Sequence, residues 1–212
     1  MQKSIEVLDR AIEISKEMMD QRGYSVHFYT SNENQGILIE ESANYPEIKL
    51  ISMNPITNDK IYFFFTESEK LNKGIVEKYK NIIQSLTLNH CIFIYRNNIT
   101  SSAKTLIDKF DSIVENIDSI KIELFIINSL QYNITSHILV PKHERECKET
   151  AKLIQKKYGT KLPFILESDP VSKFYGFEKG EIIKITRKIK TLVLQCTYRH
   201  ICVCSCLCHF NY

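Results

Sequence analysis

The fold of the first part of this chain is decided by residues 61–65, IYFFF, and by two later runs like it, CIFIY at residues 91–95 and IELFII at residues 122–127. Each run is short, mainly apolar and rich in β-branched or aromatic residues, which is typical of a buried strand. Residues 73–86 carry apolar side chains at helical spacing, and a further helix opens at residues 100–102. Strands that alternate with helices in this way predict an α/β layer with parallel strand pairing.

The residues before this layer extend the same unit. Residues 4–20 place apolar side chains on one helical face, and Gly23 follows where such a helix should end. Strand-like runs come next, at residues 36–39 and 48–53. We therefore predict a first domain of α/β type over residues 1–133.

The pattern changes after residue 133. Residues 144–158 predict a charged helix that Gly159 ends. Ser168, Asp169 and Pro170 predict the start of a short helix, because either Ser or Asp can cap a helix and Pro suits the first turn. Gly176 stands where that short helix should close.

A strand pair completes the second part. Residues 178–180 form a turn signal that leads into a strand at residues 181–187, and residues 192–199 are expected to pair with it. This predicts a small α+β domain over residues 134–201, followed by a cysteine-rich extension over residues 202–212. The fold class of the whole chain is then α+β.

Charge is unevenly distributed between the two parts. Residues 137–212 hold 14 Lys and Arg against 7 Asp and Glu, a net charge of +7, whereas residues 1–136 hold 14 against 18, a net charge of −4. The asymmetry indicates two units with different partners. The basic part fits nucleic acid or an acidic protein surface, or its lysines simply keep a small domain in solution.

Several function classes find no support. No secretory signal opens the chain, and no run approaches the ~20 apolar residues of a membrane span, so we expect an intracellular protein with no membrane partner. No glycine-rich phosphate loop is present, which argues against a nucleotide-dependent enzyme and against a bound cofactor.

The cysteine-rich end raises a metal hypothesis. Cys202, Cys204, Cys206 and Cys208 alternate along the chain, and thiolates bind zinc or copper. On a strand, however, they would spread over ~20 Å, too far for one tetrahedral site. A metal-binding tail and an apolar extension both stay open, and no metal ligand is assigned.

A nuclease hypothesis rests on Glu47 and Lys49, which have the E-x-K spacing of restriction-type nucleases. Such sites need a further carboxylate to hold Mg²⁺. No Asp lies between Asp20 and Asp59, and Glu40 and Glu41 are the only near substitutes, so no catalytic residue is assigned.

The helix start at residues 100–104, TSSAK, offers hydroxyls, first-turn N–H groups and a lysine. These groups suit a phosphate, and they equally suit ordinary helix capping. Both interpretations stay open on the residues alone.

The second part resembles a known family over its whole length. Its residues 137–143 (HILVPKH), 162–163 (LP), 168–171 (SDPV), 175–176 (YG), 179–187 (KGEIIKITR) and 197–199 (TYR) follow one another as in the assembly domain of the fifth, shared subunit of eukaryotic RNA polymerases I, II and III, and as in the small archaeal RNA polymerase subunit that corresponds to it. The first part is similar to the jaw domain of the eukaryotic and large-DNA-virus versions, at residues 21–24, 61–65, 73–75 and 100–104.

This resemblance implies a non-catalytic structural subunit of a DNA-directed RNA polymerase. It implies docking on the largest subunit, contact with other polymerase subunits, and sequence-independent contact with downstream double-stranded DNA. The implied DNA-contacting residues are Thr100, Ser101, Ser102 and Lys104. The implied subunit-interface residues are His137, Pro141, His143, Pro163, Asp169, Pro170, Tyr175, Gly176, Gly180, Arg187, Tyr198 and Arg199.

The implied location is the nucleus for a cellular polymerase, and the virion or the host cytoplasm for one from a large DNA virus. Two departures from the family are visible. Residues 188–195 lack the glycine and proline that the family has there, and residues 202–212 extend past the family's end. Partner contacts therefore carry over least securely at these two places.

Overall fold

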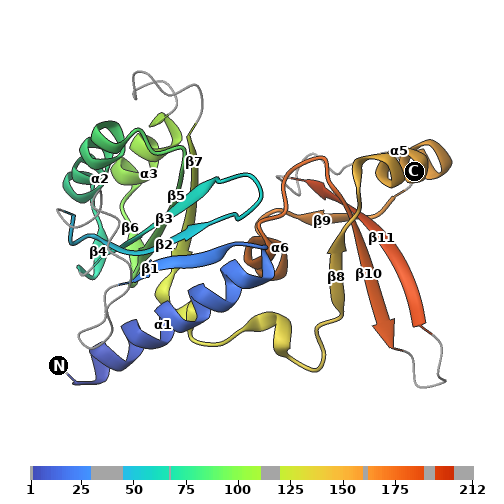
Figure 1. The fold of residues 1–212 in the computed structure, drawn as a ribbon, viewed down its shortest axis with the longest axis horizontal. Coiled ribbons are helices and arrows are strands. Elements are labelled where there is room, and N and C mark those ends of the chain that lie inside the picture. The colour runs from blue at the N-terminus through green and yellow to red at the C-terminus, as the bar shows by residue number, and fades with distance from the viewer. Residues whose placement is uncertain are drawn as a thin grey trace. The chain divides into compact units, whose positions relative to one another are not determined.

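A computed structural model describes residues 2–29, 45–66, 68–110, 120–159, 162–188 and 194–202 (Figure 1). The chain divides into two compact units, Met1–Tyr132 and Asn133–Tyr212. Each unit is built from helices together with strands, so the predicted α+β class is confirmed. Among the described residues no helix is both long and apolar enough to cross a membrane.

The first unit is built on a five-stranded sheet in the order β1-β2-β3-β5-β7. The strands are β1 (Ser25–Tyr29), β2 (Ile48–Met53), β3 (Lys60–Phe65), β5 (His90–Tyr95) and β7 (Lys121–Ile126). Strand β5 pairs in parallel with β3 and with β7, which confirms the parallel layer predicted from the three apolar runs. Strands β1 and β2 continue the sheet in antiparallel fashion, so the complete sheet is mixed.

The first two helices of this unit and the start of the third lie where the sequence predicts them, whereas the short helix after β7 was not predicted. They are α1 (Gln2–Gln21), α2 (Lys73–Leu86) and α3 (Ser101–Asp108), with the short helix η1 (Ile127–Leu130) after β7. Figure 1 shows α1 on one side of the sheet and α2 and α3 on the other. The strand expected at residues 36–39 lies outside the described residues.

Aromatic side chains fill the core between the sheet and α2. The ring centroid of Phe64 lies 4.8 Å from that of Tyr79 and 5.4 Å from that of Phe93, and Phe110 continues the cluster from beyond α3. Successive strand residues face opposite sides, so Phe63 points to the other face, where it is fully buried. Burial on both faces is why β3 reads as a continuous apolar run.

The second unit holds a four-stranded sheet in the order β8-β10-β11-β9. Its strands are β8 (Lys142–Arg145), β9 (Phe164–Leu166), β10 (Ile182–Lys188) and β11 (Leu194–Cys202), and its helices are η2 (Ile134–Ser136), α5 (Lys148–Tyr158) and α6 (Pro170–Tyr175). The predicted antiparallel pairing of residues 181–187 with residues 192–199 is confirmed by β10 and β11.

One boundary was predicted wrongly. The helix expected from residue 144 begins at Lys148, because Lys142–Arg145 pairs with β10 as the edge strand β8. That pairing joins residues about forty positions apart, so no local pattern announces it.

Each face of this sheet has its own small core. On the face that we call the α6 face, Ile183, Ile185 and Ile201 pack with Phe177, and Tyr175 of α6 lies against them. On the opposite face, which we call the α5 face, Ile182 packs with Ile154 of α5 and with Leu162. Successive side chains of β10 point to opposite faces of the sheet, and this alternation therefore determines which helix covers which face.

Candidate interfaces for nucleic acid and for a partner subunit

The four residues expected to contact DNA lie together on the first turn of α3, which we call the α3 turn. Thr100 caps the helix by accepting the backbone N–H of Ala103 at 3.3 Å, and its hydroxyl lies 3.2 Å from that of Ser102. Ala103 is fully buried, whereas Ser101, Ser102 and Lys104 are exposed. The buried alanine anchors the turn and leaves the polar side chains facing solvent.

A second helix start lies beside the α3 turn. The two-residue strands β4 (Lys70–Leu71) and β6 (Asn98–Ile99) pair in parallel, and Thr100 donates both its N–H and its hydroxyl to the carbonyl of Leu71, at 3.1 and 3.4 Å. The next residue, Asn72, caps α2 by accepting the N–H of Ile75 at 3.0 Å. Sequence reasoning missed this neighbour because two-residue strands have no readable periodicity.

This edge of the first unit suits a phosphate chemically. The first N–H groups of a helix have no acceptor within the helix and carry a partial positive charge. Lys70 and Lys104 are exposed here, and Lys73 is exposed beside Glu77, at 3.5 Å. Lysines, hydroxyls and free N–H groups bind the nucleic-acid backbone without reading sequence.

In the second unit, the loop before β8 exposes large apolar side chains. Ile138 is 93% exposed and Leu139 is 82% exposed. The loop is nonetheless ordered, because His137 accepts the N–H of Leu139 on its Nδ1 at 3.2 Å and the N–H of Val140 on its carbonyl at 2.9 Å. We call Ile138 and Leu139 the apolar pair. The sequence predicted His137 and Pro141, which lie on either side of the pair, as interface residues. The apolar run between these two residues was the sequence feature that could have revealed the pair.

His143 is the one buried member of the expected interface set. It is 8% exposed, and its Nδ1 donates to the carbonyl of Pro141 at 2.7 Å. Burial lowers the pKa of His143, with a contribution from Arg187 and Arg199, while the hydrogen bond to Pro141 and the charge of Asp169 act in the opposite direction. His143 therefore fixes the loop from inside the unit.

Asp169, Pro170 and Gly176 build the short helix α6. Asp169 caps it by accepting the N–H groups of Val171 at 2.9 Å and Ser172 at 3.3 Å, and Pro170 occupies its first position. Gly176 ends the helix with φ 65°, a left-handed conformation that suits glycine. The predicted helix start and stop are confirmed, and these residues have a structural role whatever they contact.

The remaining interface residues are distributed around the sheet. Arg187 and Arg199 share the α6 face with His143, because strand alternation and the β8-β10-β11 register place them there. Tyr198 lies on the α5 face, where it packs beside Ile182.

The last three interface residues lie outside the strands. Pro163 is exposed before β9. Gly180 turns the chain at φ 91°, and its N–H donates to the carbonyl of Ile201 at 3.2 Å. Tyr175 stacks on Phe177 at 5.2 Å. The set therefore does not form one contiguous surface.

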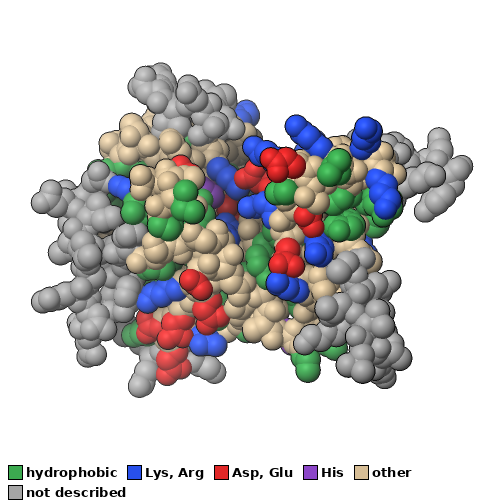
Figure 2. Space-filling model, turned by 45° about the vertical axis from the view of Figure 1, so that its right-hand side comes forward, with side chains coloured by type: hydrophobic (Ala, Val, Ile, Leu, Met, Phe, Trp, Pro, Cys, Tyr) green, Lys and Arg blue, Asp and Glu red, His purple; other side chains and the backbone are tan. Residues whose placement is uncertain are grey.

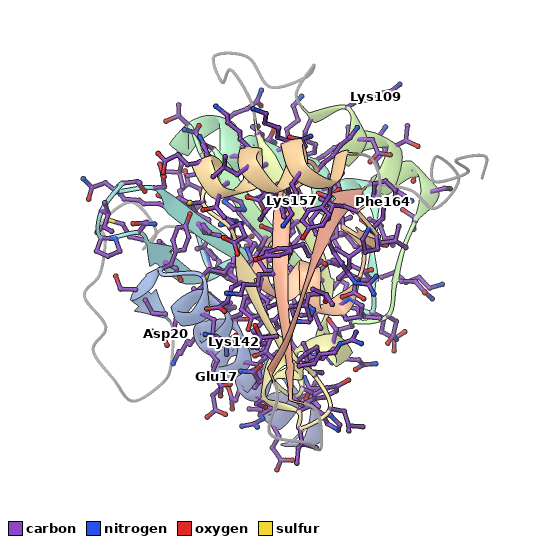
Figure 3. The ribbon with its side chains drawn as sticks, turned by 90° about the vertical axis from the view of Figure 1, so that its right-hand side faces the viewer. Glu17, Asp20, Lys109, Lys142, Lys157 and Phe164 are labelled. Carbon is purple, nitrogen blue, oxygen red and sulfur yellow. The ribbon has the colours of Figure 1, made fainter. Side chains whose placement is uncertain are left out.

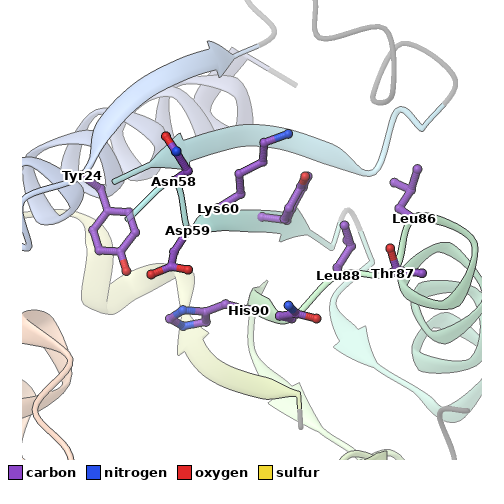
Figure 4. Close-up of a pocket in the computed structure, with 10 residues that line it drawn as sticks. Tyr24, Asn58, Asp59, Lys60, Leu86, Thr87, Leu88 and His90 are labelled. Carbon is purple, nitrogen blue, oxygen red and sulfur yellow. The ribbon is translucent and has the colours of Figure 1, made fainter. Parts of the chain in front are cut away.

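A polar hollow that sequence reasoning missed lies in the first unit. It encloses about 320 Å³ between the β2–β3 turn, the end of α2 and the start of β5. Figure 4 shows the hydroxyl of Tyr24, the carboxylate of Asp59 and the ring of His90 turned toward one another. Scattered polar residues on three separate segments give no sequence pattern that would reveal it.

A buried ion cluster lies behind His90. Arg22 binds both carboxylate oxygens of Glu123, at 2.9 and 2.8 Å, and His90 Nε2 lies 2.8 Å from the same carboxylate. Burial raises the pKa of Glu123, but the hydrogen bond with His90 and the charge and hydrogen bonds of Arg22 outweigh it and hold the pKa well below its usual range. The cluster joins the end of α1 to strands β5 and β7.

The nuclease hypothesis finds no second carboxylate. Glu47 lines a separate hollow of about 230 Å³ together with Thr66 and Lys78, and it is the one carboxylate among the described residues that line it. A Mg²⁺ site of the restriction type needs at least two carboxylates. Glu40 and Glu41, the near substitutes for a second carboxylate, lie outside the described residues.

The cysteine hypothesis cannot be followed along the tail, because residues 203–212 lie outside the described residues. Within the described part of the chain, no group of three or more His, Cys, Asp or Glu side chains could hold a metal. Cys91 is buried, and burial raises the pKa of its thiol, which removes it as a nucleophile.

Comparison with known proteins finds a family model that matches the second unit. Residues 132–201 match the family model described as RNA polymerase Rpb5, C-terminal domain. These residues begin at the end of the first unit and include every helix and strand of the second except the last residue of β11.

Similarity also extends over the first unit. The subunit rpabc1 of DNA-directed RNA polymerases I, II and III from Dictyostelium discoideum is 29% identical over 94% of this chain and 100% of its own length. The RPABC1 subunit from Caenorhabditis elegans is 29% identical over 71% of this chain and 70% of its own length. The subunit 5A of DNA-directed RNA polymerase V from Arabidopsis thaliana is 33% identical over 59% of this chain and 54% of its own length. The chain is thus similar, over nearly its whole length, to the fifth, shared subunit of eukaryotic RNA polymerases, and its residues 132–201 match the model of that family's C-terminal domain.

Proposed function

We propose that this chain is a non-catalytic structural subunit of a multisubunit DNA-directed RNA polymerase. Residues 134–201 act as an assembly domain that docks on the largest subunit, and residues 1–133 act as a jaw domain beside the downstream DNA. In a cellular polymerase this places the chain in the nucleus. The observation that carries the proposal is the apolar pair, displayed within the unit that matches the polymerase family.

The apolar pair has the properties of a docking contact. Two large apolar side chains, each more than four-fifths exposed, stand next to each other on a loop that hydrogen bonds hold in place. Complete burial of an aliphatic side chain of this size contributes roughly 1.5–3 kcal/mol. A partner that covers Ile138 and Leu139 would gain this free energy with little ordering cost, because the loop is already fixed by His137 and His143.

Co-purification tests the docking. The chain would be co-expressed with the largest polymerase subunit of its own source, as wild type and as the double variant Ile138→Ser/Leu139→Ser. We expect the variant to lose at least tenfold in recovered complex. The matched control is Ile56→Ser/Leu153→Ser, which removes the same two residue types from positions 89% and 68% exposed. Full recovery of the first variant, or equal loss in the control, would contradict the docking proposal.

The DNA contact is tested through its salt dependence. Each phosphate contact contributes about 0.9 to the slope of log affinity against log salt. We expect Lys104→Gln to weaken binding of a mixed-sequence duplex and to lower this slope by about 1. Lys49→Gln, which removes a lysine from β2 instead, serves as the control. An unchanged salt slope in Lys104→Gln would contradict the proposal that the α3 turn contacts DNA.

We also propose that the chain has no catalytic activity of its own. Among the described residues, the E-x-K hollow holds a single carboxylate, and the matching proteins are polymerase subunits. Purified chain with Mg²⁺ should leave plasmid DNA intact. Cleavage that disappears in Glu47→Ala would overturn this part of the proposal.

A further inference from the structure

Helix α5 presents a row of three lysines to solvent. Lys148, Lys152 and Lys156 follow one another at four-residue spacing, so they lie along one ridge of the helix, about 6 Å apart. All three are exposed. Ile154, the buried residue of α5, anchors the helix to the sheet and lies roughly opposite Lys152 on the helical wheel. Figure 3 shows α5 crossing the end of the sheet, with Lys157 labelled on it.

The lysine row is electrostatically uncompensated. No ion pair within the described part of the chain includes any of its three members, whereas Lys73 pairs with Glu77 and Lys142 with Glu144. Like charges at this spacing destabilise a helix by about 0.2–0.5 kcal/mol per pair. Space-filling colouring shows Lys and Arg side chains gathered over this part of the second unit (Figure 2).

The helix dipole acts differently on the three lysines. Lys148 occupies the first position of α5, where the positive end of the helix dipole disfavours a cation. Its N-cap, Cys147, has its Sγ 3.0 Å from the hydroxyl of Thr150, and Glu149 supplies a favourable negative charge in the first turn. Lys156 lies in the last turn, where a cation is favourable, so the dipole disfavours Lys148 alone among the three lysines.

The composition of the row selects its partner. Protein–protein interfaces are depleted in lysine and enriched in aromatic residues, methionine and arginine. Single-stranded nucleic acids are bound through exposed aromatic rings, and Tyr158 lies on the far side of α5 from the row. Point charges along a straight, rigid ridge match a polyanion with a regular backbone. We infer that the lysine row of α5 binds the phosphate backbone of double-stranded DNA.

This contact is separate from the α3 turn and from the docking of the apolar pair. It lies on the second unit, which carries the net charge of +7, and it stands whether or not the other two proposals hold. Binding would be independent of sequence and sensitive to salt, because it consists of lysine–phosphate contacts alone.

The experiment measures binding of the full chain to a fluorescent duplex of mixed sequence, by anisotropy at KCl concentrations between about 50 and 200 mM. The variant Lys148→Gln/Lys152→Gln/Lys156→Gln is compared with wild type in a Lys104→Gln background, so that the α3 turn is already impaired. We expect the salt slope to fall by about 2 to 3, since each lost phosphate contact contributes about 0.9. The Arg variant at the same three positions should retain the slope.

The matched control is Lys16→Gln/Lys78→Gln/Lys80→Gln, which removes the same charge from the first unit. We expect it to lower the slope by less than about 1. Equal loss in both variants would show a diffuse effect of net charge and overturn the inference. So would an unchanged slope, or a loss of binding to polyglutamate in place of DNA, which would identify an acidic protein as the partner. Circular dichroism confirms that each variant retains its helices.

Discussion

At the scale of single residues, Glu123 holds together the buried ion cluster of the first unit. It is the common partner of Arg22 and His90, and the Arg22 side chain is only 5% exposed. Glu123→Gln removes the carboxylate charge that binds the buried guanidinium of Arg22, and breaking a buried ion pair typically costs about 3–5 kcal/mol. We expect a loss of about 3 kcal/mol in the free energy of unfolding, measured by urea denaturation at about pH 7.

The pH dependence gives this prediction a second readout. Because the pKa of Glu123 is lowered in the folded state, its stabilisation is present above the ordinary glutamate pKa of about 4.3 and is lost as pH falls below it. The wild type should therefore lose more stability than Glu123→Gln between about pH 5 and pH 3. The control is Lys121→Gln, whose Nζ lies 3.9 Å from Glu123 on a side chain 39% exposed and should matter by less than about 1 kcal/mol. Parallel pH profiles of wild type and Glu123→Gln would contradict the assignment.

His143 makes a residue-scale prediction of its own in the second unit. Burial lowers its pKa, so the unfolded chain takes up a proton before the folded chain does. The stability of the unit should therefore fall as pH decreases through the ordinary histidine pKa of about 6.5. His143→Gln should flatten this dependence between about pH 7.5 and 5.5, measured by denaturant unfolding, and a dependence as steep as that of the wild type would contradict the prediction.

At the scale of elements, two substitutions of Asp169 distinguish its role as the cap of α6 from a contact with the partner subunit. Asp169→Ala removes two capping hydrogen bonds and should cost about 1 kcal/mol in the stability of the second unit. Asp169→Asn keeps a side-chain oxygen for the cap and should stay within about 0.5 kcal/mol of wild type. If Asp169→Asn is stable but no longer co-purifies with the largest subunit, the negative charge of Asp169 contacts that subunit. If co-purification is unchanged, the role of Asp169 is to cap α6.

The helices and strands also show which parts of the fold could be predicted from the sequence. The strands β3, β5 and β7 were predictable from their short apolar runs, and the helix α2 from its apolar stripe at helical spacing, although Phe125 is the one buried residue of β7. The short helix α6 was predictable from its capping chemistry at Asp169 and Gly176. By contrast, β8 and the pair β4–β6 exist only through hydrogen bonds to distant segments, so their residues read as helix or loop.

The same reasoning applies to the candidate sites. Thr100 and its neighbours were predictable as a group because one helical turn holds them together. The neighbouring start of α2, the polar hollow around His90 and the exposure of Ile138 and Leu139 depend on tertiary placement. A sequence shows that a residue is apolar, but only the folded unit shows that nothing in the described chain covers it.

At the scale of the whole molecule, the two units have separate cores. The aromatic cluster around Phe93 belongs to the first unit, and the two small clusters around Ile182 and Ile183 belong to the second. Opposite net charges on the two parts of the chain agree with units that meet different partners. A chain of this kind should unfold in two steps, because interfaces between domains are usually too small to couple their unfolding.

Matched isoleucines test this separation. Ile92 and Ile183 are each fully buried in a strand, one in each unit. Each change to Val should cost about 0.5–1.5 kcal/mol and lower one calorimetric transition by several degrees. Ile92→Val should move only one of two transitions and Ile183→Val only the other. A single transition that shifts with either variant would mean that the units fold as one, and the docking and DNA-binding surfaces would then respond to damage in either unit.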